Sequence, residues 1–224
     1  MKLKVCGMKY VENIEQVAAL QPDYMGFIFY EKSKRNFEGV IPKLSKSIKK
    51  TGVFVNEHLE IVSSFVQKHQ LEAIQLHGDE SVNYIIALKA LFRERASGVI
   101  TGLKNAAHAN KDIEIIKVFG VKDHFDFDIL KPYEEVVDFF LFDTKGKERG
   151  GNGVKFDWTL LKSYPYSKPF FLSGGIGLED VDEVSSFLQG QESPTCFAID
   201  VNSKFEIEPG IKNIEKLKAL KKKI

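Results

Sequence analysis

The sequence has little cysteine and no long apolar segment. Of its 224 residues only Cys6 and Cys196 are cysteines, too few for a framework of disulfides. No stretch approaches the ~20 consecutive apolar residues that a membrane-spanning helix needs. The first residues, Met-Lys-Leu-Lys-Val-Cys-Gly, contain too short an apolar run for a signal peptide. We therefore expect a cytoplasmic protein with two free thiols and no membrane partner.

The sequence also lacks an excess of either charge. Its 32 Lys and Arg residues balance 31 Asp and Glu residues, for a formal net charge of +1. No overall field therefore favours nucleic acid as a partner. No linker rich in Pro, Gly or Ser and no low-complexity tract divides the chain, so we expect one domain over residues 1–224.

Eight short apolar runs recur along the chain. They are rich in Val, Ile and Phe and nearly continuous, which is typical of strands covered on both faces. The predicted strands cover residues 3–6, 24–30, 52–55, 73–76, 113–119, 139–142, 169–172 and 196–201.

Segments with helical periodicity lie between most of these runs. The clearest cover residues 11–20, 58–69, 81–92 and 178–188; weaker ones cover 43–49 and 158–162, and a last helix is expected over 211–223. This alternation favours the α/β class, and eight strands in this length fit a closed (β/α)8 TIM barrel better than an open doubly wound sheet. Residues 91–113 fit poorly, and we interpret them as an insertion at the N-terminal face of the barrel.

Polar residues stand at nearly every predicted strand exit. In a barrel, the active site is built from these exits and the loops that follow them. The polar set includes Cys6, Arg35, Asn56, Gln75, His77, Asp143, Ser173, Asp200 and Asn202.

Two glycine clusters follow strands in the second half of the chain. Gly174 and Gly175 follow the seventh strand, and Asn202 and Ser203 follow the eighth. Loops at these places often bind phosphate through backbone amides, although a plain tight turn is the alternative for a lone Gly-Gly pair. The glycines at 150–153 suit either a lid that excludes water or a surface loop without a role.

Cys6 and Asp143 are the candidate acid–base residues. Cys6 could be a nucleophile, a general base or a small buried hydrophobe; Lys4 shares its strand face, and in the barrel interior the ammonium would favour the thiolate. Asp143 follows an apolar run, where desolvation would raise its pKa and suit a general acid; a cap or loop carboxylate is the alternative. Asp200 has the same two interpretations, and Cys196 is expected to be structural.

His77 and Arg35, near two further strand exits, each have two interpretations. His77 could bind substrate or satisfy a backbone group. Arg35 could hold an anionic group through two hydrogen bonds or lie solvated among the neighbouring lysines.

Taken together, these segments resemble the phosphoribosylanthranilate isomerases of tryptophan biosynthesis. The resemblance covers nearly the whole chain apart from residues 91–113. The matching motifs are KVCG at 4–7, GFIFYEKSKR at 26–35, GVFVN at 52–56, QLHG at 75–78, FDT at 142–144, GGNG at 150–153 with FDW at 156–158, LSGG at 172–175, and IDVNS at 199–203 with Glu206 and PG at 209–210.

The resemblance implies an isomerase acting on a small phosphorylated aminosugar. Its reaction converts N-(5-phosphoribosyl)anthranilate to 1-(2-carboxyphenylamino)-1-deoxyribulose 5-phosphate, an Amadori rearrangement that needs no metal and no organic cofactor. The resemblance implies Cys6 as the base and Asp143 as the acid. These roles require the pKa of Cys6 to be lowered and that of Asp143 to be raised.

The resemblance also implies how the two ends of the substrate are held. Arg35 would hold the anthranilate carboxylate, with further substrate contacts from Gln75, His77 and Asp200. The predicted phosphate-binding residues are Gly174, Gly175, Asn202 and Ser203.

Two departures and two rivals qualify this interpretation. One departure is the extra length before the fifth strand, at residues 91–113. Lys204 stands where the family usually has glycine, which is unfavourable if a positive φ is needed; alternatively, its ammonium helps to neutralise the phosphate. One rival is a related isomerase of histidine biosynthesis, but those relatives carry aspartate in place of Cys6. The other is a barrel that only binds phosphorylated metabolites, against which Cys6, Asp143 and Arg35 speak. A monomer and a homodimer both remain open.

Overall fold

A computed structural model describes residues 1–96, 113–144, 155–189 and 195–224. The glycine cluster at 150–153 and most of the predicted insertion at 91–113 lie outside these residues. None of the helices within the described ranges has the length and apolar content needed to cross a bilayer.

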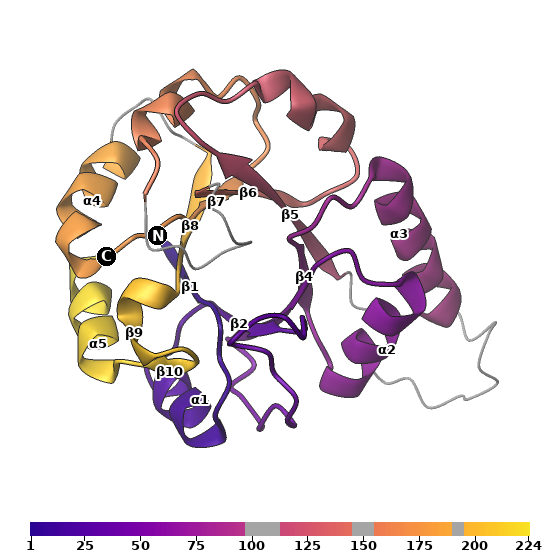
Figure 1. Cartoon of the computed structure of the whole chain (residues 1–224), viewed down its shortest axis with the longest axis horizontal. Coiled ribbons are helices and arrows are strands. Elements are labelled where there is room, and N and C mark those ends of the chain that lie inside the picture. The colour runs from indigo at the N-terminus through magenta and orange to yellow at the C-terminus, as the bar shows by residue number, and fades with distance from the viewer. Residues whose placement is uncertain (97–112, 145–154, 190–194) are drawn as a thin grey trace.

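Eight parallel strands close into a barrel in chain order, and the predicted (β/α)8 fold is confirmed (Figure 1). All eight predicted runs form strands, with bounds that differ by a few residues. The strands are β1 (Lys2–Val5), β2 (Tyr24–Ile28), β3 (Lys49–Phe54), β4 (Ala73–Leu76), β5 (Glu114–Val121), β6 (Phe139–Thr144), β7 (Phe170–Leu172) and β8 (Cys196–Val201).

Helices surround the strands on the outside of the barrel (Figure 1). The α-helices are α1 (Val11–Ala18), α2 (Leu59–His69), α3 (Val82–Ala96), α4 (Val181–Gln189) and α5 (Ile214–Lys223). Short 3-10 helices complete the connections, namely η1 (Phe127–Tyr133), η2 (Trp158–Ser163), η3 (Leu178–Asp180) and η4 (Ser203–Phe205).

Two predicted helix assignments are corrected by the structure. No helix forms at 43–49, because Lys49 already pairs with Tyr24 as the first residue of β3 and leaves too few residues to nucleate a helix. The last helix begins at Ile214 rather than at 211, where Asn213 caps it by accepting a hydrogen bond from the Lys216 backbone N–H at 3.0 Å. The residues before it form a hairpin of β9 (Glu206–Glu208) and β10 (Ile211–Lys212).

The interior of the barrel changes from apolar to polar along the strand direction. A buried cluster fills its N-terminal part, and consists of Tyr24, Ala73, Ile116, Val118, Phe139, Leu141, Phe171 and Ala198. Two residues further along a strand, the side chain points to the same face. The residues that follow Ala73, Leu141 and Ala198 at this spacing are Gln75, Asp143 and Asp200, so strand alternation itself delivers polar groups to the C-terminal mouth.

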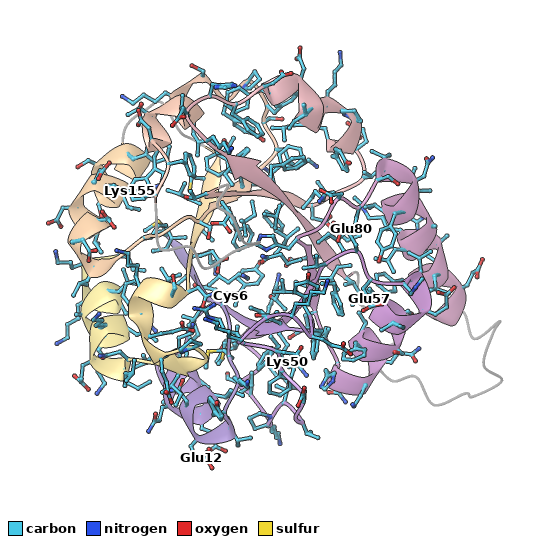
Figure 2. The ribbon with its side chains drawn as sticks, viewed as in Figure 1. Cys6, Glu12, Lys50, Glu57, Glu80 and Lys155 are labelled. Atoms are coloured by element: carbon cyan, nitrogen blue, oxygen red, sulfur yellow. The ribbon has the colours of Figure 1, made fainter. Side chains whose placement is uncertain are left out.

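A buried ion pair joins the middle of β5 to the segment that follows β4. The Lys117 Nζ lies 3.0 Å from Glu80 Oε2 and donates to the Gly78 carbonyl at 2.8 Å. Glu80 also accepts backbone N–H groups of Asn56 at 2.8 Å and Gly78 at 3.0 Å. In Figure 2, Glu80 lies between the ring of strands and α3. The pair therefore fixes the segment that follows His77.

We predict that Glu80→Met lowers the free energy of unfolding by about 3–5 kcal/mol, because it leaves the Lys117 ammonium buried without its carboxylate. Urea denaturation followed by circular dichroism measures this. Glu215→Gln removes an exposed carboxylate paired with Lys218 and should leave the midpoint unchanged. A loss below about 1 kcal/mol in Glu80→Met would contradict the role given to the pair.

Candidate active site

A buried ion pair lies at the centre of the candidate site. The Lys4 Nζ is 2.9 Å from Asp200 Oδ1, and the two side chains are 0% and 5% exposed. Strand register explains the contact, since Lys4 of β1 and Asp200 of β8 are direct neighbours where the barrel closes. Both charges therefore lie inside the barrel, just below its C-terminal mouth.

Cys6 stands directly above this pair. It follows β1 on the same strand face as Lys4 and is 4% exposed. Glycine at position 26 makes room for it, because a Cβ there would come within 2.7 Å of the Cys6 Sγ. Figure 2 shows Cys6 near the middle of the ring of strands.

The pKa of the Cys6 thiol is raised, which corrects the prediction of a lowered one. Burial is the largest cause, and the charge on Asp200 adds to it. Lys4 and Lys212 act in the opposite direction, as the sequence predicted for Lys4. Burial prevails because Lys4 faces the Asp200 carboxylate as well as the thiol. Without ligand, Cys6 is therefore a thiol at neutral pH.

Asp143 ends β6 at the same mouth, and its environment matches the prediction. Its pKa is raised to about 6, first by burial and then by the charge on Asp200. The Thr144 backbone N–H donates to Asp143 Oδ1 at 2.9 Å and, together with Lys4, opposes this shift. A carboxyl group with such a pKa holds a proton in part of the molecules near neutral pH.

Two residues of β4 and its exit approach Asp143. The His77 Nε2 lies 3.6 Å from Asp143 Oδ2, and the Gln75 side-chain amide is 3.3 Å from His77 Nδ1. Gln75 is buried, and its Oε1 has no hydrogen-bond partner among the described residues. The structure thus brings together three of the predicted site residues on adjoining parts of the mouth.

Arg35 is held by a residue outside the predicted set. Its Nε donates to both Glu206 carboxylate oxygens, at 2.9 and 3.0 Å, and its Nη2 donates to Oε2 at 2.7 Å. The Glu206 side chain is 4% exposed, and its pKa is lowered by Arg35 and Lys212 against the effect of burial. The alternative of a solvated Arg35 is wrong, since this side chain is only 14% exposed.

The predicted phosphate loops lie after β7 and β8. Gly174 and Gly175 have φ values of 95° and 66°, which favour glycine. A Cβ on Gly174 would come within 2.5 Å of Thr144 Oγ1, so this loop packs closely on the end of β6. Asn202 and Ser203 lead into η4, where Asn202 Oδ1 accepts from the Lys212 ammonium at 2.6 Å.

Lys204 does not need the backbone conformation of glycine. It lies within η4, and the non-glycine residues of positive φ in the described ranges are Gln21, Asn56 and Gln70. Its Nζ lies 3.6 Å from Glu179 Oε1 at the start of η3. A lysine at position 204 is therefore compatible with the backbone of this turn.

The remaining cysteine and the metal-ligating side chains complete the inventory. Cys196 begins β8, and burial raises its pKa to about 12, which fits the structural role expected for it. Over the described ranges, no three His, Cys, Asp or Glu side chains are grouped to hold a metal ion. Lys212 and Asn13, which support the site, gave no signal in the sequence, because one lysine among many and one helical asparagine are unremarkable.

The chain is similar to proteins of one family. A family model described as N-(5'-phosphoribosyl)anthranilate (PRA) isomerase matches residues 3–97 and 98–223. The N-(5'-phosphoribosyl)anthranilate isomerase of Parabacteroides distasonis is 38% identical over 224 residues, covering 97% of this chain and 90% of that protein.

Two solved structures share the fold of this chain at lower sequence identity. A phosphoribosyl anthranilate isomerase in complex with reduced 1-(o-carboxyphenylamino)-1-deoxyribulose 5-phosphate is 29% identical, with a TM-score of 0.72 and coverage of 100% of this chain and 97% of that one. Monomers generated from the dimeric phosphoribosylanthranilate isomerase of Thermotoga maritima are 26% identical, with a TM-score of 0.71 and coverage of 100% and 97%.

We predict that Asp143→Asn stabilises the protein above pH 6. A raised pKa means that the folded state binds the proton more tightly than the unfolded chain. Ionisation therefore opposes folding progressively from about pH 4, the ordinary pKa of an aspartate, and the effect is complete above the folded pKa of about 6. Removing it should add about 1–3 kcal/mol to the free energy of unfolding at pH 7.5. The gain should shrink as the pH falls from 6 towards 4.

Urea denaturation at several pH values measures this difference. Asp123→Asn changes an exposed aspartate on the β5–η1 connection and serves as the matched control, with no expected change. Equal stability of Asp143→Asn and the parent at pH 7.5 would contradict a desolvated Asp143.

Proposed function

Because the chain belongs to the N-(5'-phosphoribosyl)anthranilate isomerase family, we propose that Cys6 and Asp143 carry out the proton transfers of its reaction. The protein is an isomerase of tryptophan biosynthesis. The reaction turns the aminoaldose N-(5-phosphoribosyl)anthranilate into the aminoketose 1-(2-carboxyphenylamino)-1-deoxyribulose 5-phosphate.

One observation carries the assignment of the two residues. The Lys4–Asp200 pair acts on both, because Asp200 and Lys4 each influence the pKa of Cys6 and the pKa of Asp143. Cys6 and Asp143, 137 positions apart in sequence (143 − 6), therefore belong to one charged cluster. A sulfur and a carboxyl group on one cluster at the mouth supply the two partners that an internal proton shift requires.

The steps balance with these two groups alone. Asp143 gives its proton to the furanose ring oxygen, the C1–O bond breaks, and the nitrogen lone pair forms the Schiff base. The Cys6 thiolate then removes the C2 proton, and the electron pair moves through C1 to nitrogen, giving the enolamine. In the tautomerisation to the ketone, Cys6 gives its proton to C1 and the C2 hydroxyl gives its proton to Asp143, so both groups return to their starting states.

The resting and the productive forms of the site differ in where one proton resides. At neutral pH the thiol of Cys6 is protonated and Asp143 is mostly ionised. The productive form holds the same number of protons but has the proton on Asp143 and a thiolate on Cys6. Since the two forms differ only in where one proton resides, their ratio does not change with pH between the two pKa values.

The substrate carries an anion at each end, and the site offers a place for each. Arg35 is assigned to the anthranilate carboxylate, and its hydrogen bonds to Glu206 hold the guanidinium in place. The phosphate is assigned to the backbone amides around Gly174 and Gly175 and to the turn at Asn202 and Ser203.

Three further residues line the space between these ends. His77 and Gln75 lie beside Asp143 and are assigned to the ribose and amine part of the substrate. Asp200 is also assigned to substrate binding. Its contact with Lys4 gives it a second task, which is to hold the ammonium next to Cys6.

The partner is a free small molecule, bound by a monomer or a homodimer. The relative from Thermotoga maritima that is described as dimeric supports the homodimer. Cys6 must stay reduced for this chemistry, so the reducing cytoplasm is the proposed location.

We predict that Cys6→Ser and Asp143→Asn each lower kcat by at least ~100-fold, the usual scale for loss of a general base or acid. The assay follows the fluorescence of the anthranilate group after addition of fresh substrate. Cys196→Ser removes the other thiol and should retain full turnover. A rate within about threefold of the parent in either site variant would refute that residue's role.

A further inference from the structure

Lys212 is a buried cation behind the candidate site. Its side chain is 0% exposed. Asn13 of α1 fixes its backbone from both sides, because the Lys212 N–H donates to Asn13 Oδ1 at 2.7 Å and the Asn13 amide donates to the Lys212 carbonyl at 3.0 Å. A lysine that is fully buried needs partners for its charge.

The ammonium of Lys212 has two strong partners on different elements. It donates to Asn202 Oδ1 at 2.6 Å, at the exit of β8, and to Glu206 Oε1 at 2.7 Å, in β9. Both distances are typical of hydrogen bonds in which one group is ionised. The ammonium therefore ties the turn after β8 to the β9–β10 hairpin.

The second partner continues the chain of contacts to Arg35. Glu206 accepts from Lys212 through Oε1 and from Arg35 through both oxygens. Gly7, directly after Cys6, lies between the two ends of this chain. A Cβ there would come within 2.6 Å of Asn202 Oδ1 and 2.8 Å of Arg35 Cδ.

We infer that Lys212 is a positioning residue that holds both anion-binding ends of the substrate site at once, Arg35 through Glu206 and the phosphate turn through Asn202. This inference rests on the proposed function, which assigns those two ends. No hydrogen bond described above joins Lys212 to Arg35 or to the reacting atoms. It acts by fixing the distance between two groups that must receive a carboxylate and a phosphate together.

The network behind the site contains two cations that share one carboxylate. Lys212 and Arg35 both pair with Glu206. Burial lowers the pKa of Lys212 to about 8, against the opposing effect of Glu206. The charged and titratable groups that face it are Glu206, Arg35, Cys6 and Asp200.

The test uses the two ends of the substrate as separate probes. Inorganic phosphate and anthranilate are measured as competitive inhibitors of the full-length enzyme. In Lys212→Met we expect KM to rise about tenfold or more and both inhibition constants to rise at least about threefold. The loss in kcat should be smaller than the rise in KM, and it follows from the effect of Lys212 on the pKa of Cys6. Arg35→Ala should weaken anthranilate and leave phosphate unchanged. Lys222→Met removes an exposed lysine of α5 and is the matched control.

Weakening of only one probe in Lys212→Met, or a fall in kcat with KM unchanged, would overturn the inference. The wild-type enzyme provides a second measurement that needs no variant. Both inhibition constants should rise above about pH 8 as Lys212 loses its proton, because anthranilate and phosphate keep their charges over that range. Inhibition constants that stay flat to pH 9.5 would also overturn it. A wild-type protein without turnover would instead refute the proposed function, and direct binding of the two probes would still test Lys212.

Discussion

The Lys4–Asp200 ion pair is the interaction on which the rest of the site depends. It spans β1 and β8, the two strands whose pairing closes the barrel, and both side chains are buried. An isolated charge at this depth would be strongly unfavourable, so each member requires the other. The pair keeps a negative charge near Asp143 and a positive charge near Cys6. One structural contact thus sets the electrostatics of both candidate acid–base groups.

The barrel separates stability from chemistry along its axis. Aromatic and branched side chains fill the N-terminal part of the interior, and the ring centroids of Tyr24 and Phe171 lie 5.2 Å apart there. The polar layer above carries the candidate chemistry, and a second polar network behind the mouth joins Lys212, Glu206 and Arg35. Buried cations held by hydrogen bonds are rigid, and a rigid site keeps its two anion-binding ends at a fixed separation.

Sequence reasoning reached the fold because its signals were local. Nearly continuous apolar runs identified all eight strands, and the apolar run before Asp143 predicted a desolvated position with a raised pKa, as the structure has it. It failed where the outcome depends on distant partners. The pKa of Cys6 follows from burial that outweighs Lys4, and the role of Lys212 follows from a hairpin whose residues looked like the start of a helix. The pairing of Arg35 with Glu206 joins residues 171 positions apart.

The pH dependence of kcat/KM tests the central claim most directly, because it reports the ionisation of the free enzyme. If the reaction needs a protonated Asp143 together with a Cys6 thiolate, and Asp143 has the lower pKa, the profile should be level from about pH 6 to about pH 8. It should fall roughly tenfold per unit below pH 6. A profile that instead rises about tenfold per unit from pH 6 to pH 8 would mean that only the thiol titrates, and would contradict the account.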